Sequence, residues 1–197
     1  KYSKTDLAIA PTLFLEFHGT DMGVQEQSKI VQGIAAESGG SNFEWTTNTE
    51  ERNRLWQARH DAAYACKALV PNGEIWATDV CVPISQLAEC IRETQADIRE
   101  SKLIAPIVGH VGDGNFHLVL LVDKDNAEEV QRAHALHERM VMRALAMGGT
   151  CTGEHGIGYG KLDFLIAEHG EAVNVMRSIK QALDPNNIMN PGKVLRV

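Results

Sequence analysis

The sequence predicts an α+β fold in which an antiparallel sheet is covered by helices. Apolar stretches with the two-residue period of strands are interleaved with stretches that have the period of amphipathic helices. The turn Gly112-Asp113-Gly114 separates two strand-like stretches and is typical of a β-hairpin, which joins antiparallel neighbours. No repeat of roughly 20–50 residues occurs and no low-complexity linker divides the chain. Residues 1–197 are therefore expected to form one domain.

Each predicted strand is a short apolar run that ends at turn-forming residues. The first run alternates Leu13, Leu15 and Phe17 with the residues between them, which is the pattern of a half-buried strand. The two longest runs flank the Gly-Asp-Gly turn. The expected strands cover residues 12–18, 43–46, 75–82, 104–110 and 115–122.

Helices are predicted where the apolar period is helical and a capping residue, a proline or a glycine marks an end. Asp21 is the expected N-cap of the first helix, which Gly39 ends. Pro83 opens a later helix, and Gly148 ends the longest one. The expected helices cover residues 21–38, 49–69, 83–101, 127–147, 162–169 and 171–183.

Composition excludes several classes of function. The chain has 197 residues and a net charge of −7, so it offers no basic stripe for a nucleic-acid backbone. Its longest apolar runs, such as residues 116–122, are too short to span a bilayer. The four cysteines lack CxxC spacing, which favours reduced thiols in a cytoplasmic protein over a disulfide framework or a zinc knuckle. Cys151 is expected to pack under a loop rather than to react.

Two Gly-rich segments concentrate histidine and carboxylate side chains. The first is His110-Val-Gly-Asp-Gly-Asn-Phe-His117, and the second, residues 150–158, contains Glu154 and His155. The odd spacing of His110 and His117 would place them on opposite faces of one strand, but the turn between them can return both to one face. With Glu154 they would form an N,N,O set with open positions, as in catalytic sites for Zn²⁺ or Mn²⁺. His155 could then move a proton.

The same residues also fit other interpretations. A histidine pair in a hairpin is often only hydrogen-bonded to nearby loops, and glycines often mark only tight turns. On spacing alone, this alternative and the metal site are evenly matched. Residues 153–158 could instead form an anion-binding nest, although they lack the Lys-Ser/Thr of a P-loop. Arg59 could clamp a substrate carboxylate or form a surface ion pair with Glu51 or Asp61.

Three motifs in order resemble the C-terminal domain of FAD-linked oxidases. They are His110-Val-Gly-Asp-Gly-Asn-Phe-His117, Gly153-Glu-His-Gly-Ile-Gly158, and the ending with Asp184-Pro and Met189-Asn-Pro-Gly-Lys193. The resemblance is greatest to the D-lactate dehydrogenase (cytochrome) type, with the glycolate oxidase FAD subunit and D-2-hydroxyglutarate dehydrogenase as relatives. Leu55-Trp56-x-x-Arg59 and Asp79-Val-Cys-Val-Pro83 fit the same pattern, so the resemblance covers essentially the whole chain.

The resemblance implies a fold and a set of roles. The fold would be the ferredoxin-like cap domain of the vanillyl-alcohol-oxidase type flavoproteins, and the FAD-binding domain that precedes it in the family is not matched here. His110, His117 and Glu154 would bind a divalent metal, zinc or manganese, that holds a D-2-hydroxy acid. His155 would take the hydroxyl proton, hydride would pass from C2 to flavin N5, and Asn190 would lie against the flavin.

One departure bears on the substrate. The 2-hydroxyglutarate enzymes carry Lys two positions before the strand aspartate, whereas this chain has Ala77 before Asp79. This favours D-lactate over acids with a distal carboxylate. The expected partners are an FAD-binding domain or subunit and an electron acceptor such as a cytochrome or quinone. A homodimer, a peripheral place at the inner membrane and, in a eukaryote, a mitochondrial location stay open.

Three rival functions remain at this stage. The chain could belong to a glycolate oxidase subunit or to a dehydrogenase of another D-2-hydroxy acid. It could be a non-catalytic interaction module that keeps the fold. It could also be a metal-dependent hydrolase that uses the same ligands, which would turn over esters or amides without flavin.

Overall fold

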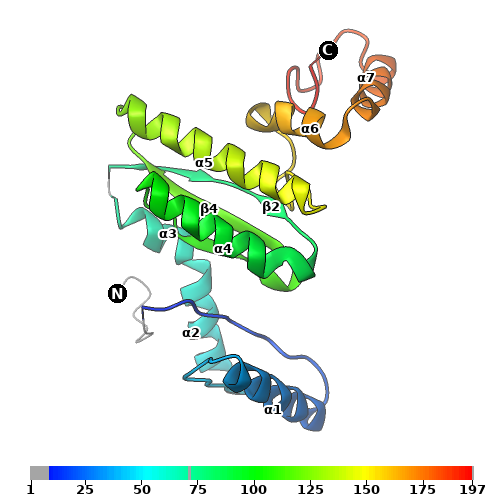
Figure 1. Ribbon diagram of the computed structural model, residues 1–197. Helices are drawn as coiled ribbons and strands as arrows, with labels where there is room; N and C mark the ends of the chain where they lie inside the picture. The colour runs from blue at the N-terminus through cyan, green and yellow to red at the C-terminus, as the bar shows by residue number, and fades with distance from the viewer. Residues whose placement is uncertain (1–8, 71, 197) are drawn as a thin grey trace. The chain divides into compact units, whose positions relative to one another are not determined.

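The computed structural model describes residues 9–70 and 72–196, which divide into two compact units (Figure 1). The first unit is described from residue 9 to Ala65 and the second from Cys66 to residue 196. The expectation of one domain over residues 1–197 stays a prediction. Each unit is considered by itself.

The regular secondary structure of the first unit, over its described residues, consists of helices. Helix α1 spans Asp21–Glu37, α2 spans Thr49–His60, and α3 begins at Ala62 and ends at Lys67 in the second unit. The Thr20 side chain accepts a hydrogen bond from the backbone of Gly23, so Thr20 rather than Asp21 is the N-cap of α1. The single helix expected over residues 49–69 is interrupted at Asp61, which caps α2.

The prediction of two strands in this unit is wrong. Residues 12–18 and 43–46 have no regular secondary structure. Leu13 and Leu15 are 67% and 49% exposed, so the alternating apolar side chains do not pack into a core. A strand needs a neighbour to satisfy its backbone groups, and within residues 9–65 no strand pairs with either segment. Alternation along the sequence cannot supply that partner.

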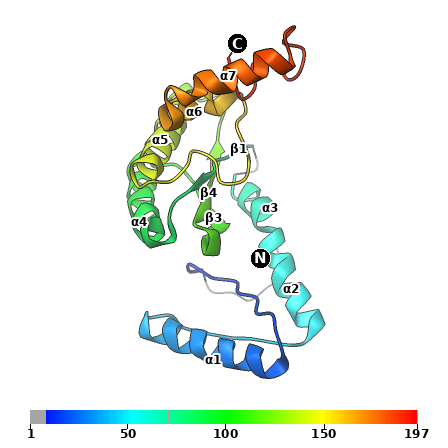
Figure 2. The same cartoon turned by 90° about the vertical axis from the view of Figure 1, so that its right-hand side faces the viewer.

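The second unit is built around one central strand, β4, which spans Asn115–Val122. It pairs antiparallel with β1 (Glu74–Ala77), β2 (Val80–Cys81) and β3 (Ile107–His110), as Figure 2 shows in part. The pairs Glu74↔Val122 and Val80↔Phe116 follow one register, so residues 74–81 run along β4 without a shift. That register brings Asp79 beside His117.

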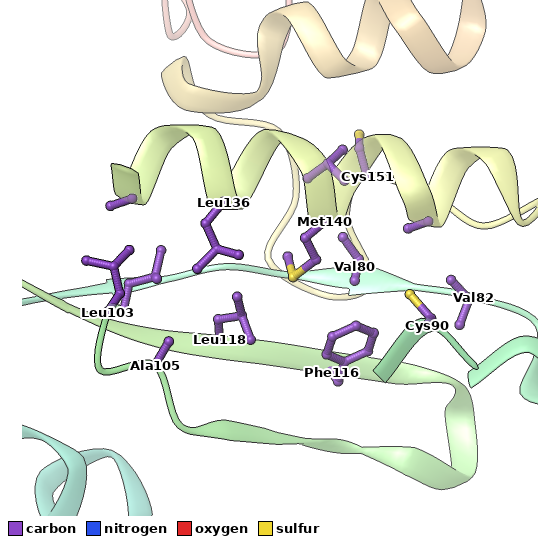
Figure 3. Packing of buried hydrophobic residues seen from close by; sticks show 14 of the residues in the cluster. Val80, Val82, Cys90, Leu103, Ala105, Phe116, Leu118, Leu136, Met140 and Cys151 are labelled. Atoms are coloured by element: carbon purple, nitrogen blue, oxygen red, sulfur yellow. The ribbon is translucent and has the colours of Figure 1, made fainter. Parts of the chain in front are cut away.

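Helices α4 (Ile84–Ser101) and α5 (Ala127–Ala146) cover one face of this sheet (Figure 1). Figure 3 shows side chains of β4 packed beneath α5. Alternate residues of β4, Phe116, Leu118 and Leu120, are almost wholly buried against the two helices. Their partners include Leu136 and Met140 of α5, because side chains of the same parity share one face of a strand. The antiparallel sheet covered by helices is the α+β architecture that the sequence predicts.

Shorter elements complete the unit. The hairpin turn contains the 3-10 helix η1 (Val111–Asp113), and η2 (Tyr159–Lys161) precedes α6 (Leu162–His169) and α7 (Ala172–Leu183). Gly114 ends the hairpin turn at φ 77°, where an added Cβ would lie 2.0 Å from the carbonyl oxygen of Val82. Among the described residues, none of the helices is both long and apolar enough to cross a membrane.

Candidate active site

The face of β4 opposite the helix-covered one carries polar side chains at one end. Asn115 and His117 are two residues apart and therefore point to the same side. In the hairpin register His110 lies opposite Asn115, so the His110 side chain shares that face. His117 is 7% exposed, whereas His110 lies on the surface.

The two nitrogens of His117 have different partners. Nδ1 lies 2.8 Å from the carbonyl oxygen of Thr78, an oxygen that can only accept a hydrogen bond. We therefore assign a proton to Nδ1, so Nε2 is the ring nitrogen that faces the site. Nε2 lies 2.8 Å from Oε1 of Glu154. The loop after α5 thus brings its carboxylate to the strand histidine, as the Gly-rich segments predict.

His155 lies against the same imidazole. The rings of His117 and His155 are stacked, with centroids 4.8 Å apart and planes inclined by 8°. Together with Asp79 they form a group whose candidate ligand atoms all lie within 4.8 Å of one another. His110 and Glu154 are not members of that group. The structure therefore brings Glu154 and His155 to His117, and it adds an aspartate outside the predicted ligand set.

Asp79 is the most buried member of the site, with no exposed surface. Burial by itself raises the pKa of its carboxyl group, but hydrogen bonds from the backbone of His155, from Thr152 and Asn115 and from the backbone of Glu154 outweigh it. They hold the Asp79 pKa well below its usual range. The ammonium of Lys161 lies 3.4 Å from the same carboxylate and donates to the Asp79 carbonyl at 3.0 Å.

The loop comes this close because of a glycine. A Cβ added at Gly153 would lie 2.1 Å from Nδ2 of Asn115 and 3.1 Å from Oδ1 of Asp79. Any side chain at this position would push the loop away from the strand. This close approach explains why the residue before Glu154 and His155 is a glycine.

Two predicted site residues lie elsewhere in the chain. Arg59 is half-buried in α2 of the first unit. Asn190 lies in the turn after α7, where its backbone has a left-handed φ of 47° and its carbonyl accepts from the Lys193 amide at 3.2 Å. Their predicted contacts with substrate and flavin stay predictions.

Cys151 begins the Gly-rich loop but is not exposed. It is wholly buried, and burial together with the neighbouring Glu168 carboxylate raises the pKa of its thiol to about 12. Because the thiolate is the reactive form, this cysteine is inert at neutral pH. The interpretation of Cys151 as a packed residue agrees with this environment.

Sequence reasoning missed Asp79, Asn115 and Lys161 as members of the site. Asp79 had a signal that could have revealed it, since a carboxylate inside an otherwise apolar strand must find donors once the strand is buried. Lys161 had none, because a lysine before a helix is ordinarily solvated.

Comparison with known protein families identifies the family of this chain. The model of the family described as FAD linked oxidases, C-terminal domain, matches residues 2–194. The chain belongs to this family. The resemblance drawn from the three motifs is thereby confirmed, and the Gly-rich segments around His117 and Glu154 lie within the matched region.

Curated relatives point to one type of FAD-linked oxidase. The chain is 51% identical over its whole length to "Probable D-lactate dehydrogenase, mitochondrial" of Danio rerio, of which it covers 40%. It is 46% identical over 96% of its length to D-lactate dehydrogenase [cytochrome], mitochondrial, of Arabidopsis thaliana, of which it covers 34%. Glycolate oxidase subunit GlcD of Bacillus subtilis is 30% identical over 92% of the chain. The chain thus spans two fifths or less of these D-lactate dehydrogenases.

A solved structure supports the fold. The 4-ethylphenol oxidase of Gulosibacter chungangensis, in its isoeugenol complex, aligns with 90% of this chain at a TM-score of 0.64 and 18% identity. The alignment covers 37% of that protein. At this identity the similarity concerns the fold alone.

Proposed function

We propose that this chain is the substrate- and metal-binding part of an FAD-dependent D-2-hydroxy-acid dehydrogenase that oxidises D-lactate to pyruvate. The observation that carries the proposal is the cluster at β4, where Glu154 and His155 meet the buried imidazole of His117. Four relatives that are 41–51% identical to the chain are named D-lactate dehydrogenases.

The residues at the cluster suit a divalent cation. We assign Nε2 of His117, the Glu154 carboxylate and the imidazole of His110 as its ligands, zinc and manganese both being compatible with this set. Oδ1 of Asn115 is a second sign, because it is buried and has no hydrogen-bond partner among the described residues. A bound metal would lower the pKa of the substrate hydroxyl, and FAD would supply the hydride acceptor.

The residues of the chain then have separate tasks. The Thr78 carbonyl fixes the His117 tautomer, so that Nε2 faces Glu154. His155 is exposed and carries no assigned ligand role, so its ring nitrogen is free to take the proton of the substrate hydroxyl as general base. We assign to Arg59 a bidentate contact with the substrate carboxylate.

The remaining partners rest on the relatives. FAD would be held mainly by a part of the relatives' length that this chain does not cover, with Asn190 placed against the flavin. A cytochrome is the proposed electron acceptor because three relatives carry that word in their names. A mitochondrial location and a homodimer stay proposals, and the glycolate oxidase subunits at about 30% identity make glycolate the second candidate substrate.

The test is flavin reduction by the full-length protein. D-lactate should reduce the flavin faster than L-lactate or glycolate. His155→Ala should slow the reduction by about 10²–10⁴-fold, the usual loss when a general base is removed, while the metal content stays unchanged. His134→Ala is the matched control, because this exposed imidazole lies on α5 and packs against Trp76, outside the cluster. Near-parental reduction by His155→Ala would refute the base assignment, and faster reduction by glycolate would select the second candidate.

A further inference from the structure

The carboxylate of Asp79 has an unusually complete set of partners. Oδ1 accepts from Nδ2 of Asn115 at 2.8 Å. Oδ2 accepts from the hydroxyl of Thr152 at 2.7 Å, the amide of His155 at 2.9 Å, the amide of Glu154 at 3.1 Å and the ammonium of Lys161 at 3.4 Å. The side chain has no exposed surface.

Three of these donors belong to one loop. Thr152, Glu154 and His155 lie 73 to 76 residues after Asp79 in sequence, yet they converge on a single oxygen atom. Two of them are the backbone amides of the proposed metal ligand and the proposed base. The position of both residues therefore depends on one carboxylate of the β1–β2 segment.

We propose that Asp79 is a positioning residue that anchors the 152–155 loop to the sheet, so that Glu154 and His155 are held against His117, and that Asp79 is not itself a metal ligand. The part of this inference that concerns metal rests on the function proposed above. The anchoring part concerns the chain alone.

The hydrogen bonds explain why Asp79 would not bind metal, although it lies in the group of candidate ligands. A carboxylate offers about four lone-pair positions. Three strong donors and an ammonium surround Oδ2, and Asn115 occupies one side of Oδ1. The nearest His117 nitrogen, 3.6 Å from Oδ1, is the protonated Nδ1. A cation at Asp79 would have to displace bonds that already compensate for burial.

The charge of Asp79 is also balanced from within the fold. Lys161 is 11% exposed at its side chain and reaches both the carbonyl and the carboxylate of Asp79. It lies in η2, directly after the Gly-rich loop. The loop is therefore attached to the same aspartate at its start and at its end, which restricts the residues between them.

Hydrogen–deuterium exchange of the full-length protein without metal tests the anchor directly. Asp79→Asn removes the charge and turns one acceptor into a donor, so peptides over residues 152–158 should exchange about ten- to hundredfold faster, which corresponds to one lost hydrogen bond to a charged group. Thr152→Val removes one donor and keeps the aspartate. Thr152→Val should accelerate exchange in the same peptides by a smaller factor. It also keeps the test decisive if Asp79→Asn does not fold.

Asp184 provides the matched control. It is 6% exposed and accepts from the amides of Ile188 and Met189, so it anchors the turn after α7 in the same way. Asp184→Asn should accelerate exchange around residues 184–189 and leave residues 152–158 unchanged. If both variants accelerate exchange equally in the 152–158 peptides, the Asp79→Asn effect is general destabilisation of the fold. That outcome would overturn the proposal.

Cobalt titration separates a positioning role from a ligand role. Asp79→Asn should bind one Co²⁺ with the d–d spectrum of the parent but with a dissociation constant about 10–100-fold higher, as expected when an outer partner of a ligand is lost. A changed spectrum or lost stoichiometry would make Asp79 a ligand and overturn the proposal. If the parent binds no metal, the proposed function fails, whereas the exchange experiment still decides whether Asp79 anchors the loop.

Discussion

The two faces of β4 are equally buried but differ in what buries them. All eight residues from Asn115 to Val122 are buried. On one face Phe116, Leu118 and Leu120 pack into α4 and α5. On the other face Asn115 and His117 are enclosed by Asp79 and the loop after α5. The first face is held by apolar contact along its whole length. The second face is also apolar at Val119 and Leu121, but at Asn115 and His117 it is held by hydrogen bonds that each require a particular partner atom.

This difference predicts two kinds of failure. Loss of volume on the apolar face costs stability roughly in proportion to the cavity that remains. Loss of one polar partner leaves the others unsatisfied and changes the chemistry of the site more than the stability of the fold. The following experiments separate the two faces, beginning with the largest expected effect.

The largest effect is expected for His117→Ala. This variant removes the imidazole that meets Glu154, so metal binding and flavin reduction by D-lactate should both be lost while the cooperative unfolding transition remains. Metal titration and calorimetry measure the two properties. His134→Ala is the control, since that imidazole packs against Trp76 at a tilt of 51°, with ring centroids 5.0 Å apart. Metal binding by His117→Ala at parental affinity would contradict the proposed site.

Leu118→Ala should have the converse effect. The Leu118 side chain has no exposed surface and belongs to the core beneath α5. Its truncation should lower the free energy of unfolding by about 2–5 kcal/mol, the usual range for buried leucine. The metal affinity of the folded fraction should stay near that of the parent. Denaturant unfolding and titration at low denaturant check this, and a metal affinity that falls with stability would show that the two faces are coupled.

Gly153→Ala should weaken the polar face and should lower stability less than Leu118→Ala does. The added methyl would meet the Asn115 amide, so the loop that carries Glu154 must move outward. We expect weaker metal binding and slower flavin reduction, with a change in unfolding free energy of about 1–3 kcal/mol. Gly158→Ala is the control, because nothing lies within 4 Å of a Cβ at that position. Equal effects of the two variants would show that the close approach is unimportant.

The smallest effect is expected for thiol labelling. The Cys151 pKa of about 12 means that this thiol is essentially un-ionised at pH 8. Iodoacetamide should leave Cys151 unmodified in the folded protein and modify it after denaturation, as peptide mass spectrometry would show. Rapid labelling of folded protein would indicate that the loop over Cys151 opens.

The same pKa predicts a direction for alkaline stability. The folded pKa is raised above the ordinary thiol value, so the unfolded chain loses the Cys151 proton first as pH rises. The contribution of Cys151 to stability should therefore be present below about pH 9 and decline above it. Cys151→Ala should flatten that part of the stability profile measured by denaturant unfolding.

Local patterns in the sequence determine much of the second unit. The glycine turn defines the β3–β4 hairpin, and the helical periods predict α4, α5, α6 and α7 to within a few residues of their observed ends. The three ordered motifs also identify the family, because each combines glycines with chemically distinct side chains over a short stretch. These features depend on neighbours in the sequence, so they can be inferred without coordinates.

The tertiary structure decides what depends on distant partners. Residues 12–18 alternate like a strand but have no pairing neighbour within residues 9–65, so their pattern has no consequence. Asp79 looks like one polar residue in an apolar strand until the loop 73 to 76 residues later surrounds it with donors. Its role arises because a buried charge must be compensated by hydrogen bonds, and only the folded chain brings the groups that compensate it into reach.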